Sequence, residues 1–348
     1  MPETILVTGA SAFIGGWVIK LLLDKGYNVR GTVRSAAKEA QVLEAIPKEQ
    51  RGQVSFAHIA DIATDSFDEA VHGVDGIIHI ASPFHFKVID PEKDLLLPAI
   101  NGTLGVLKSA HKYNRSNLNK IKRIVITSSF ASIVDTNRSN QPIYTYTEKD
   151  WSPVTYEQGA AAKNDPAVAY RASKVCAERA AWDFVEKEKP SFTIATICEP
   201  MVYGPHFGRF QSLDEINTSN AALWSLVTSG KDAKIPDVRT PFWVDVRDVA
   251  YTHVAALEAA TNTNERYLIA AGSWSNQEIV DIVHESKIIP QSIKDSAPVG
   301  TKGQQLPIHY TIDSSTAQKN LGTTYIPLKK TVEDLILQLV ELQQKSTK

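Results

Sequence analysis

The sequence predicts an α/β protein built on a doubly wound parallel sheet, completed by a smaller, discontinuous part from the second half of the chain. Over roughly the first 200 residues, short β-rich apolar segments alternate with segments of helical periodicity. A glycine-rich turn joins the first strand-like segment to the first helical segment. From about residue 206 the alternation weakens, and helical patches are separated by loops rich in Pro, Gly and Lys.

Composition is that of an ordinary globular protein and argues against several functional classes. The 348 residues are 43% hydrophobic and 22% charged, and the net charge of −2 gives no electrostatic basis for binding nucleic acid or an anionic membrane. Cys176 and Cys198 form no Cys-x-x-Cys pair, and the histidines do not cluster at metal-ligand spacing. We find no signal peptide and no bilayer-spanning apolar run, so we expect a cytoplasmic protein without a metal.

Residues 4–8 form the first expected strand, and a glycine-rich turn from Gly9 to Gly16 follows it. Apolar residues then recur at helical spacing, and a second strand is expected over 27–33. A strand, a glycine turn, a helix and a second strand are the context of a dinucleotide site, in which a pyrophosphate binds the helix N-terminus. The expected cofactor contacts of this turn are Thr8, Gly9, Ser11, Ala12, Phe13 and Ile14.

One position of the turn departs from the expected Gly-x-x-Gly-x-x-Gly spacing, because Ala12 takes the middle place. Glycine there lets the backbone approach the phosphates closely. The methyl group of Ala12 is therefore expected to weaken cofactor binding or to push the turn outward.

The end of the second strand favours a phosphorylated dinucleotide. An NAD site usually places an acidic residue there to bind the ribose 2′-hydroxyl, and this chain has none. It has Arg34 and, one turn later, Lys38, and a guanidinium matches a phosphate in charge and geometry. We predict NADPH as the cofactor; the alternative for these residues is a solvated basic helix start.

The remaining strands of the sheet are expected over 54–59, 76–81, 123–127 and 192–197. Ligands of open α/β sheets bind beyond the carboxyl ends of the strands, so the residues that follow each strand should border the cofactor. For Asp61 the alternative is a helix cap. These expected contacts are Asp61, Ile62, Ala81, Ser82, Thr127, Ser128, Pro200 and Val202.

A tyrosine and a lysine four residues apart are the leading candidates for catalysis. Tyr170 and Lys174 lie in a helix expected to begin near Pro166, so their side chains share one face. A phenol ionises near pH ~10, and a cation one turn away favours its ionised form. The pair suits a general acid that protonates a carbonyl oxygen as hydride reaches the carbon. A second copy, at 325–329, contains Pro327 and is expected to be accidental.

Two adjacent hydroxyls, Ser128 and Ser129, follow the fifth strand. One can donate a hydrogen bond to a substrate carbonyl oxygen, and the other can cap the turn that follows. Asn101 lies in a helix expected over 95–111, where we expect it to make a polar contact to the active site. Residues 135–166 are polar and turn-rich, and we expect a long loop or short hairpin there.

The second half of the chain is expected to build a smaller substrate-binding part from separated segments. Helical patches are expected near 215–229 and 275–286, a strand and turn over 242–248, and a helix over 249–260 that packs back onto the sheet. The predicted division is a cofactor-binding domain over 1–200 with 240–262 packed against it, the smaller part over 201–239 and 263–330, and a C-terminal helix and tail over 331–348.

Several of these motifs together resemble the extended short-chain dehydrogenases/reductases. They are the turn from Gly9 to Gly15, Arg34, Thr127-Ser128-Ser129, Tyr170 to Lys174, and the segment 244–250. The chain is similar to the branch of dihydroflavonol reductase and, particularly over 81–84 and 94–103, to the fungal NADPH-dependent carbonyl (methylglyoxal) reductases. The resemblance extends to about residue 322.

The resemblance implies a Rossmann fold and a role for each matched residue. Tyr170 would donate the proton, and Lys174 would hold the nicotinamide ribose and favour ionisation of the tyrosine. Ser129 would polarise the carbonyl, with Ser128 beside it, and Asn101 would complete a proton relay. The 2′-phosphate would be bound by Arg34 and Lys38, and the pocket walls would be Phe84, Phe130, Val202, Tyr203 and Trp224.

Glu199 departs from the resembled family, in which Asn or another non-acidic residue usually precedes the proline, here Pro200. A carboxylate at this position would change the charge near the nicotinamide unless its side chain points away.

The sequence therefore predicts an NADPH-dependent oxidoreductase that reduces aldehydes and ketones, a carbonyl reductase or ketoreductase, acting on a small molecule as a monomer or homodimer. One alternative is an NAD-dependent sugar-nucleotide epimerase or dehydratase, against which Arg34 and Lys38 argue. A second is a non-catalytic NADPH-sensing protein, which only Ala12 favours.

Overall fold

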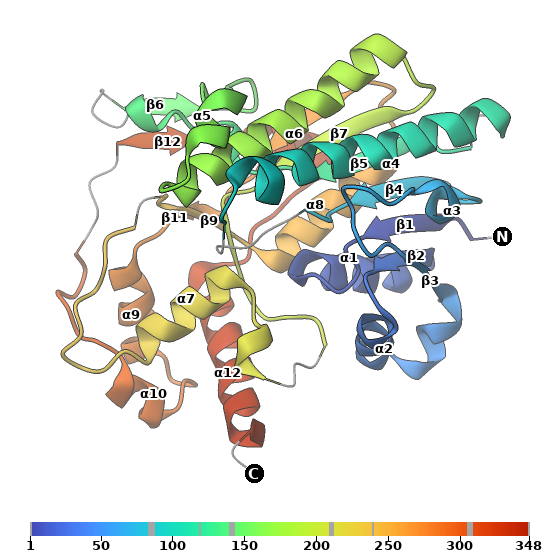
Figure 1. Ribbon diagram of the computed structural model, residues 1–348. Helices are drawn as coiled ribbons and strands as arrows, with labels where there is room; N and C mark the ends of the chain where they lie inside the picture. Colours follow the sequence, from blue (N-terminus) through green and yellow to red (C-terminus); the bar gives the residue numbers. More distant parts are fainter. Residues whose placement is uncertain are drawn as a thin grey trace.

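A seven-stranded parallel sheet forms the centre of the protein in the computed structural model, which describes residues 2–82, 88–117, 120–138, 143–208, 212–238, 240–304 and 309–346 (Figure 1). The strands are β1 (Thr4–Thr8), β2 (Asn28–Val33), β3 (Val54–His58), β4 (Gly76–His79), β5 (Arg123–Thr127), β7 (Thr193–Cys198) and β10 (Glu265–Leu268). Their order in the sheet is β3-β2-β1-β4-β5-β7-β10, and every neighbouring pair is parallel.

This order is the doubly wound arrangement, extended by one strand, so the predicted fold class is confirmed. Starting from β1, the chain first adds β2 and β3 on one side of the sheet and then adds β4 and the later strands on the other side. The strand order therefore reverses between β1 and β4, and this leaves a crevice at their carboxyl ends, where such folds bind ligands. All six strands expected from the sequence are present. The seventh, β10, was missed because it lies in the weakly patterned second half of the chain.

Helices cover both faces of the sheet (Figure 1). On one face lie α1 (Phe13–Asp24) and α8 (Val246–Glu258), and on the other lie α4 (Leu97–Ser116) and α6 (Pro166–Glu188). Each helix buries an apolar stripe, and the strands between them are apolar on both sides, as in a parallel sheet covered twice.

The helix that carries Tyr170 and Lys174 begins where the sequence predicts. Pro166 is its first residue, and the carboxylate of Asp165 accepts hydrogen bonds from the N–H groups of Ala167 and Val168. The second Tyr-x-x-x-Lys copy, at 325–329, straddles the start of a helix at residue 328, so it lies on no common helical face.

Shorter elements complete this part of the chain. They are α2 (Ala36–Ala45), η1 (Lys48–Gln53), α3 (Asp68–Val71), η2 (Glu92–Leu96), η3 (Phe130–Ser132), η4 (Thr136–Arg138), β6 (Tyr144–Tyr146), α5 (Tyr156–Ala161) and α11 (Ser315–Leu321). Residues 135–166 were expected to form a long loop or short hairpin; among their described residues, β6 pairs in parallel with the distant β12 (Tyr310–Ile312). The pairing packs the Tyr146 and Tyr310 rings together with Phe130, a long-range contact that the local sequence does not encode.

Three short strands, four α-helices and a short 3-10 helix lie beside the sheet (Figure 1) and enclose a second hydrophobic cluster. Its elements are β8 (Met201–Tyr203), η5 (Leu213–Glu215), α7 (Thr218–Val227), β9 (Phe242–Asp245), β11 (Gly272–Ser273), α9 (Asn276–Glu285), α10 (Gln291–Ser296) and α12 (Leu328–Ser346). The final helix begins at Leu328, three residues before the expected start at 331, and it buries Val332, Leu335 and Leu339 in this cluster.

Candidate active site

The turn between β1 and α1 needs glycine at two of its positions. Gly9 has φ 71°, a left-handed conformation, and a Cβ there would lie 3.1 Å from the backbone nitrogen of Ala81. A Cβ on Gly15 would lie 2.2 Å from the carbonyl oxygen of Gly9. Both glycines therefore allow the close backbone approach that the glycine-rich turn of a dinucleotide site requires.

The backbone at Ala12 adopts a conformation that any residue can take. It is extended, with φ −80° and ψ 162°, so glycine is not required, and the N–H of Ala12 donates to the carbonyl oxygen of Gly9 at 2.9 Å. No side chain among the described residues caps α1, in contrast to α2, whose first turn is capped by Ser35. The uncapped N–H groups and the positive end of the helix dipole suit a phosphate.

A cavity of about 370 Å³ lies over this helix end, and Arg34 contributes to its lining. Lys38 is not among the lining residues, and its ammonium donates to the side-chain oxygen of Gln41 at 2.8 Å. Of the two cations expected to bind a 2′-phosphate, Arg34 is thus the better placed. The sequence-predicted residues that line the cavity are Ser11, Ala12, Phe13 and Arg34.

Thr8 holds the strands together beneath this cavity. Its side chain is fully buried and accepts hydrogen bonds from the backbone nitrogens of Ile80 and Ala81 at 3.0 and 3.1 Å. It also pairs with Nδ1 of His79, whose pKa falls to about 4 because the ring is buried. The hydroxyl of Thr8 therefore fixes the exit of β4 at the crevice.

Asp61 and Ile62 follow β3 and lie at the edge of the same region. Asp61 is exposed, and its carboxylate accepts a hydrogen bond from the N–H of Ala63 at 2.8 Å within a turn, so it caps a turn rather than a helix. Ile62 is half-buried and packs against Gly102 of α4. Phe84, an expected pocket wall, lies outside the described residues.

The structure joins Lys174 to the exit of β4. Its ammonium donates to Oγ of Ser82 at 3.3 Å and lies 5.8 Å from the ring centroid of Tyr170, one turn earlier on α6. Lys174 is 9% exposed, whereas Tyr170 is half-buried. The two side chains therefore share the face of α6 that leads to the crevice, as their spacing predicts.

The three hydroxyl side chains at the carboxyl end of β5, Thr127, Ser128 and Ser129, have separate partners. Thr127 pairs with Nε2 of His253 at 2.7 Å, and Ser128 donates to Glu178 at 2.6 Å. Oγ of Ser129 accepts the N–H of Ala131 at 3.1 Å and so caps η3. The hydrogen bonds among the described residues leave the O–H hydrogen of Ser129 undonated, so this serine can both cap the turn and donate to a carbonyl oxygen.

Glu199 is buried at the carboxyl end of β7, and its Oε2 has no hydrogen-bond partner among the described residues. Burial raises its pKa from 4.5 to about 8, although the charge of Lys174 opposes the rise. Glu199 is therefore mainly a neutral acid at pH 7. A neutral Glu199 would add no charge near the nicotinamide, and its side chain is buried rather than pointing to solvent.

The remaining site predictions have mixed surroundings. Asn101 is exposed on α4, although Gly102 and Thr103 beside it are buried, so its relay role stays a prediction. Pro200 and Val202 are half-buried. Phe130 is buried in the aromatic cluster described above, which favours a packing role.

Tyr203 and Trp224 belong to the second hydrophobic cluster, and the Tyr203 ring lies edge-on to Trp274 at 5.0 Å. A second cavity, of about 620 Å³, is lined by Tyr203 but not by Trp224, and its lining is mostly apolar.

The sequence analysis missed several side chains that line the 370 Å³ cavity or lie behind Tyr170 and Lys174. Gln41, His206, Phe207 and Glu215 line the 370 Å³ cavity, and three of them come from the long connection after β8, which has no recognisable pattern. Glu178 and Arg266 were also missed. Of these two residues, only Glu178 could have been found from the sequence, because it follows Lys174 by one helical turn.

In the described part of the chain, no helix is long and apolar enough to cross a membrane, and no group of three or more His, Cys, Asp or Glu side chains could hold a metal ion.

Known proteins resemble this chain over its whole length. The model of the NAD dependent epimerase/dehydratase family matches residues 5–270. Ketoreductase azaE of Aspergillus niger is 36% identical, with 98% of each chain covered. The NADPH-dependent methylglyoxal reductase GRE2 of Saccharomyces cerevisiae is 32% identical, with 98% of this chain and 99% of the relative covered.

Solved structures agree with these sequence comparisons. The yeast methylglyoxal/isovaleraldehyde reductase Gre2, complexed with NADPH, superposes with a TM-score of 0.89 at 31% identity, over 99% of this chain and 100% of that one. MoeE5 in complex with UDP-glucuronic acid and NAD has a TM-score of 0.69 at 18% identity, over 97% and 99%, which shows a shared fold alone.

Proposed function

Because this chain belongs to the NAD dependent epimerase/dehydratase family and matches NADPH-dependent reductases over its whole length, we propose that it reduces aldehydes and ketones to alcohols with NADPH. The observation that carries the proposal is the shared face of α6, where Lys174 lies under Tyr170 and bonds to Ser82 at the crevice. Packing of α6 against η3 brings this face toward the loop of Ser129.

Bound NADPH would supply a hydride to the carbonyl carbon, and this chain's side chains would manage the charge that develops on the oxygen. Ser129 donates its O–H to that oxygen, and Tyr170 donates the phenolic proton that completes the alcohol. The ammonium of Lys174 stabilises the phenolate left on Tyr170 and holds the nicotinamide ribose. Overall, the carbonyl gains a hydride and a proton, and NADPH becomes NADP⁺.

The cofactor-binding residues fit NADPH. The uncapped N-terminus of α1 offers N–H groups to the pyrophosphate, and the close approach of Gly15 to Gly9 keeps that surface open. Arg34, exposed at the cavity, suits the 2′-phosphate, and no acidic side chain follows β2 directly. This preference argues against an NAD-dependent epimerase or dehydratase.

The assignment of the substrate site is also a proposal. We assign the smaller substrate-binding part to the second hydrophobic cluster, whose 620 Å³ apolar cavity begins at β8, just after Pro200. The partner is a small carbonyl compound, and we propose that the protein acts in the cytoplasm as a monomer or homodimer.

The test is to mix the purified protein with NADPH and a panel of carbonyls, namely methylglyoxal, branched aldehydes, aryl ketones and keto esters. Loss of reduced-cofactor absorbance reports turnover, and NADH is the control. We expect turnover that strongly favours NADPH. Binding of NADPH without reduction of any carbonyl would contradict the proposal and favour a sensing protein.

A further inference from the structure

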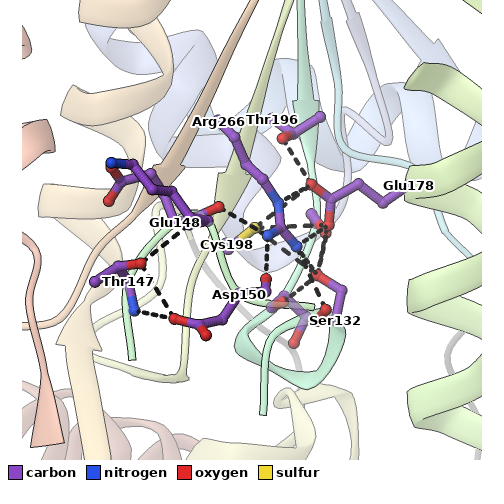
Figure 2. Close-up of polar contacts among 11 residues, drawn as sticks. Ser132, Thr147, Glu148, Asp150, Glu178, Thr196, Cys198 and Arg266 are labelled. Atoms are coloured by element: carbon purple, nitrogen blue, oxygen red, sulfur yellow. Dashed lines mark hydrogen bonds and ion pairs between the residues drawn. The ribbon is translucent and has the colours of Figure 1, made fainter. Parts of the chain in front are cut away.

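A buried charged network lies directly behind the proposed catalytic residues. Glu178 follows Lys174 by one helical turn, as Lys174 follows Tyr170, so the three side chains lie along one strip of α6. The side chain of Glu178 is only 1% exposed, and Figure 2 shows both of its carboxylate oxygens surrounded by partners from other elements.

The guanidinium of Arg266 on β10 is the principal partner of Glu178. Its Nε donates to Oε1 at 2.7 Å and its Nη2 to Oε2 at 3.1 Å, and Thr196 of β7 donates to Oε1 at 2.7 Å. Burial acts to raise the pKa of Glu178, but the bonds and charge of Arg266, together with the hydrogen bonds of Ser128 and Ser132, more than offset it, so the pKa lies below its ordinary value. Glu178 is therefore ionised throughout the neutral range.

The other carboxylate oxygen connects this pair to the serine loop. Ser128 donates to Oε2 of Glu178 at 2.6 Å, and Oγ of Ser132 lies against the same atom and 2.8 Å from the carbonyl oxygen of Ser129. The N–H of Ser132 also donates to that carbonyl at 2.9 Å. Ser129 is thus held between two serines that both bind Glu178.

Arg266 extends the network to a third segment. Its Nη1 donates to the carbonyl oxygens of Glu148 and Asp150, at 2.8 Å for Glu148 (Figure 2). Its guanidinium carbon lies 3.7 Å from the centroid of the Trp151 ring. The planar fork of an arginine can make all of these contacts at once, whereas a lysine cannot. One ion pair therefore ties α6 to β10, to the loop after β6 and to the loop after β5.

We propose that Glu178 is a positioning residue for carbonyl reduction: paired with Arg266, it fixes the loop of Ser129 against the helix of Tyr170. The inference rests on the proposed function, because Ser129 and Tyr170 must reach the same carbonyl oxygen. An error of about 1 Å in such an arrangement can cost about a hundredfold in rate. Glu178 itself lies too deep to touch substrate and acts through Ser128 and Ser132.

The experiment compares the wild type with Glu178→Gln, Ser129→Ala and the double variant. Glutamine keeps the shape but loses the charge, and its amide donors oppose those of Arg266 and the two serines. We expect kcat of Glu178→Gln to fall about 10- to 100-fold at saturating NADPH, with Kd for NADPH within about twofold of the wild type. In the Ser129→Ala background, Glu178→Gln should lower kcat little further, because the loop then carries no Ser129 hydroxyl to position.

Two control variants separate positioning from general destabilisation. Val71→Ala removes buried volume from α3, away from the crevice, and Glu258→Gln makes the matched charge change at an exposed pair with Lys25. Both should keep the wild-type kcat even where the melting temperature falls. If Glu178→Gln does not fold, Ser132→Ala takes its place, because it removes the side-chain link that runs from Glu178 through Oγ of Ser132 to the carbonyl oxygen of Ser129, while Glu178 keeps its bonds to Arg266 and Ser128. We expect a loss of at least about threefold in kcat.

A kcat within about twofold of the wild type in the variant that folds would overturn the inference. A double variant whose loss in kcat equals the product of the two single losses would overturn it as well. Failure of the proposed function looks different, since the wild type itself would then reduce no carbonyl.

Discussion

Replacing Glu199 by glutamine should stabilise the protein, and the gain should grow with pH. The carboxyl group is buried, and its pKa rises from 4.5 to about 8 on folding. A pKa raised by folding gives stability that is complete below the unfolded value and is lost as pH rises toward the folded value. The loss for Glu199 therefore accumulates between about pH 4.5 and 8. Glutamine imitates the protonated acid and does not titrate.

The size of the effect follows from the change in proton affinity. Each tenfold change is worth about 1.36 kcal/mol, so a pKa that moves from 4.5 to about 8 corresponds to on the order of 5 kcal/mol above pH 8. We expect Glu199→Gln to match the wild type near pH 4.5 and to exceed its free energy of unfolding by several kcal/mol at pH 8.5.

Urea unfolding of both proteins at pH 5, 7 and 8.5 measures this difference. Glu258→Gln is the control, because Glu258 lies at the surface in a pair with Lys25 and should show no such growth with pH. A difference between Glu199→Gln and the wild type that stays constant over the three pH values would refute the reasoning, since it would mean that Glu199 ionises in the folded protein as it does in the unfolded chain.

Three further substitutions test the cofactor site. Arg34→Ala should raise KM for NADPH about ten- to a hundredfold and change KM for NADH little, because only NADPH carries the phosphate; an equal rise for both in steady-state kinetics would contradict this. Gly15→Ala should cost about 1–3 kcal/mol in urea unfolding, because its Cβ would lie 2.2 Å from the oxygen of Gly9; unchanged stability would speak against it. Ala12→Asp should cap α1 and stabilise the protein by about 0.5–2 kcal/mol, yet raise Kd for NADPH at least about tenfold in a fluorescence titration, since the carboxylate occupies the phosphate's donors; an unaltered Kd would exclude α1 as the phosphate site.

The sequence predicted those parts of the molecule that local physics determines. The six strands, the start of α6 at Pro166 and the shared face of Tyr170 and Lys174 follow from apolar periodicity, a proline at a helix start and helical spacing. Gly9 and Gly15 were identified because their chemistry is a backbone constraint that reads directly from the residue type.

What the sequence could not show depends on contacts between distant segments. The partners of Glu178 include Arg266, 88 positions away, and β6 pairs with a strand of the smaller part. The neutral state of Glu199 depends on burial, which the residue type alone does not give. The pairing of Lys38 with Gln41, which leaves Arg34 at the cavity, likewise follows from side-chain geometry and not from the order of residues.

The role of Tyr170 is tested most directly by Tyr170→Phe, assayed for turnover and for cofactor binding together. Loss of the phenolic proton donor should lower kcat for the best carbonyl by about 10²- to 10⁴-fold, while Kd for NADPH stays within about twofold, because the ring and Lys174 remain. A variant that binds NADPH and still reduces the carbonyl at the wild-type rate would contradict the account, since the proton would then come from another group.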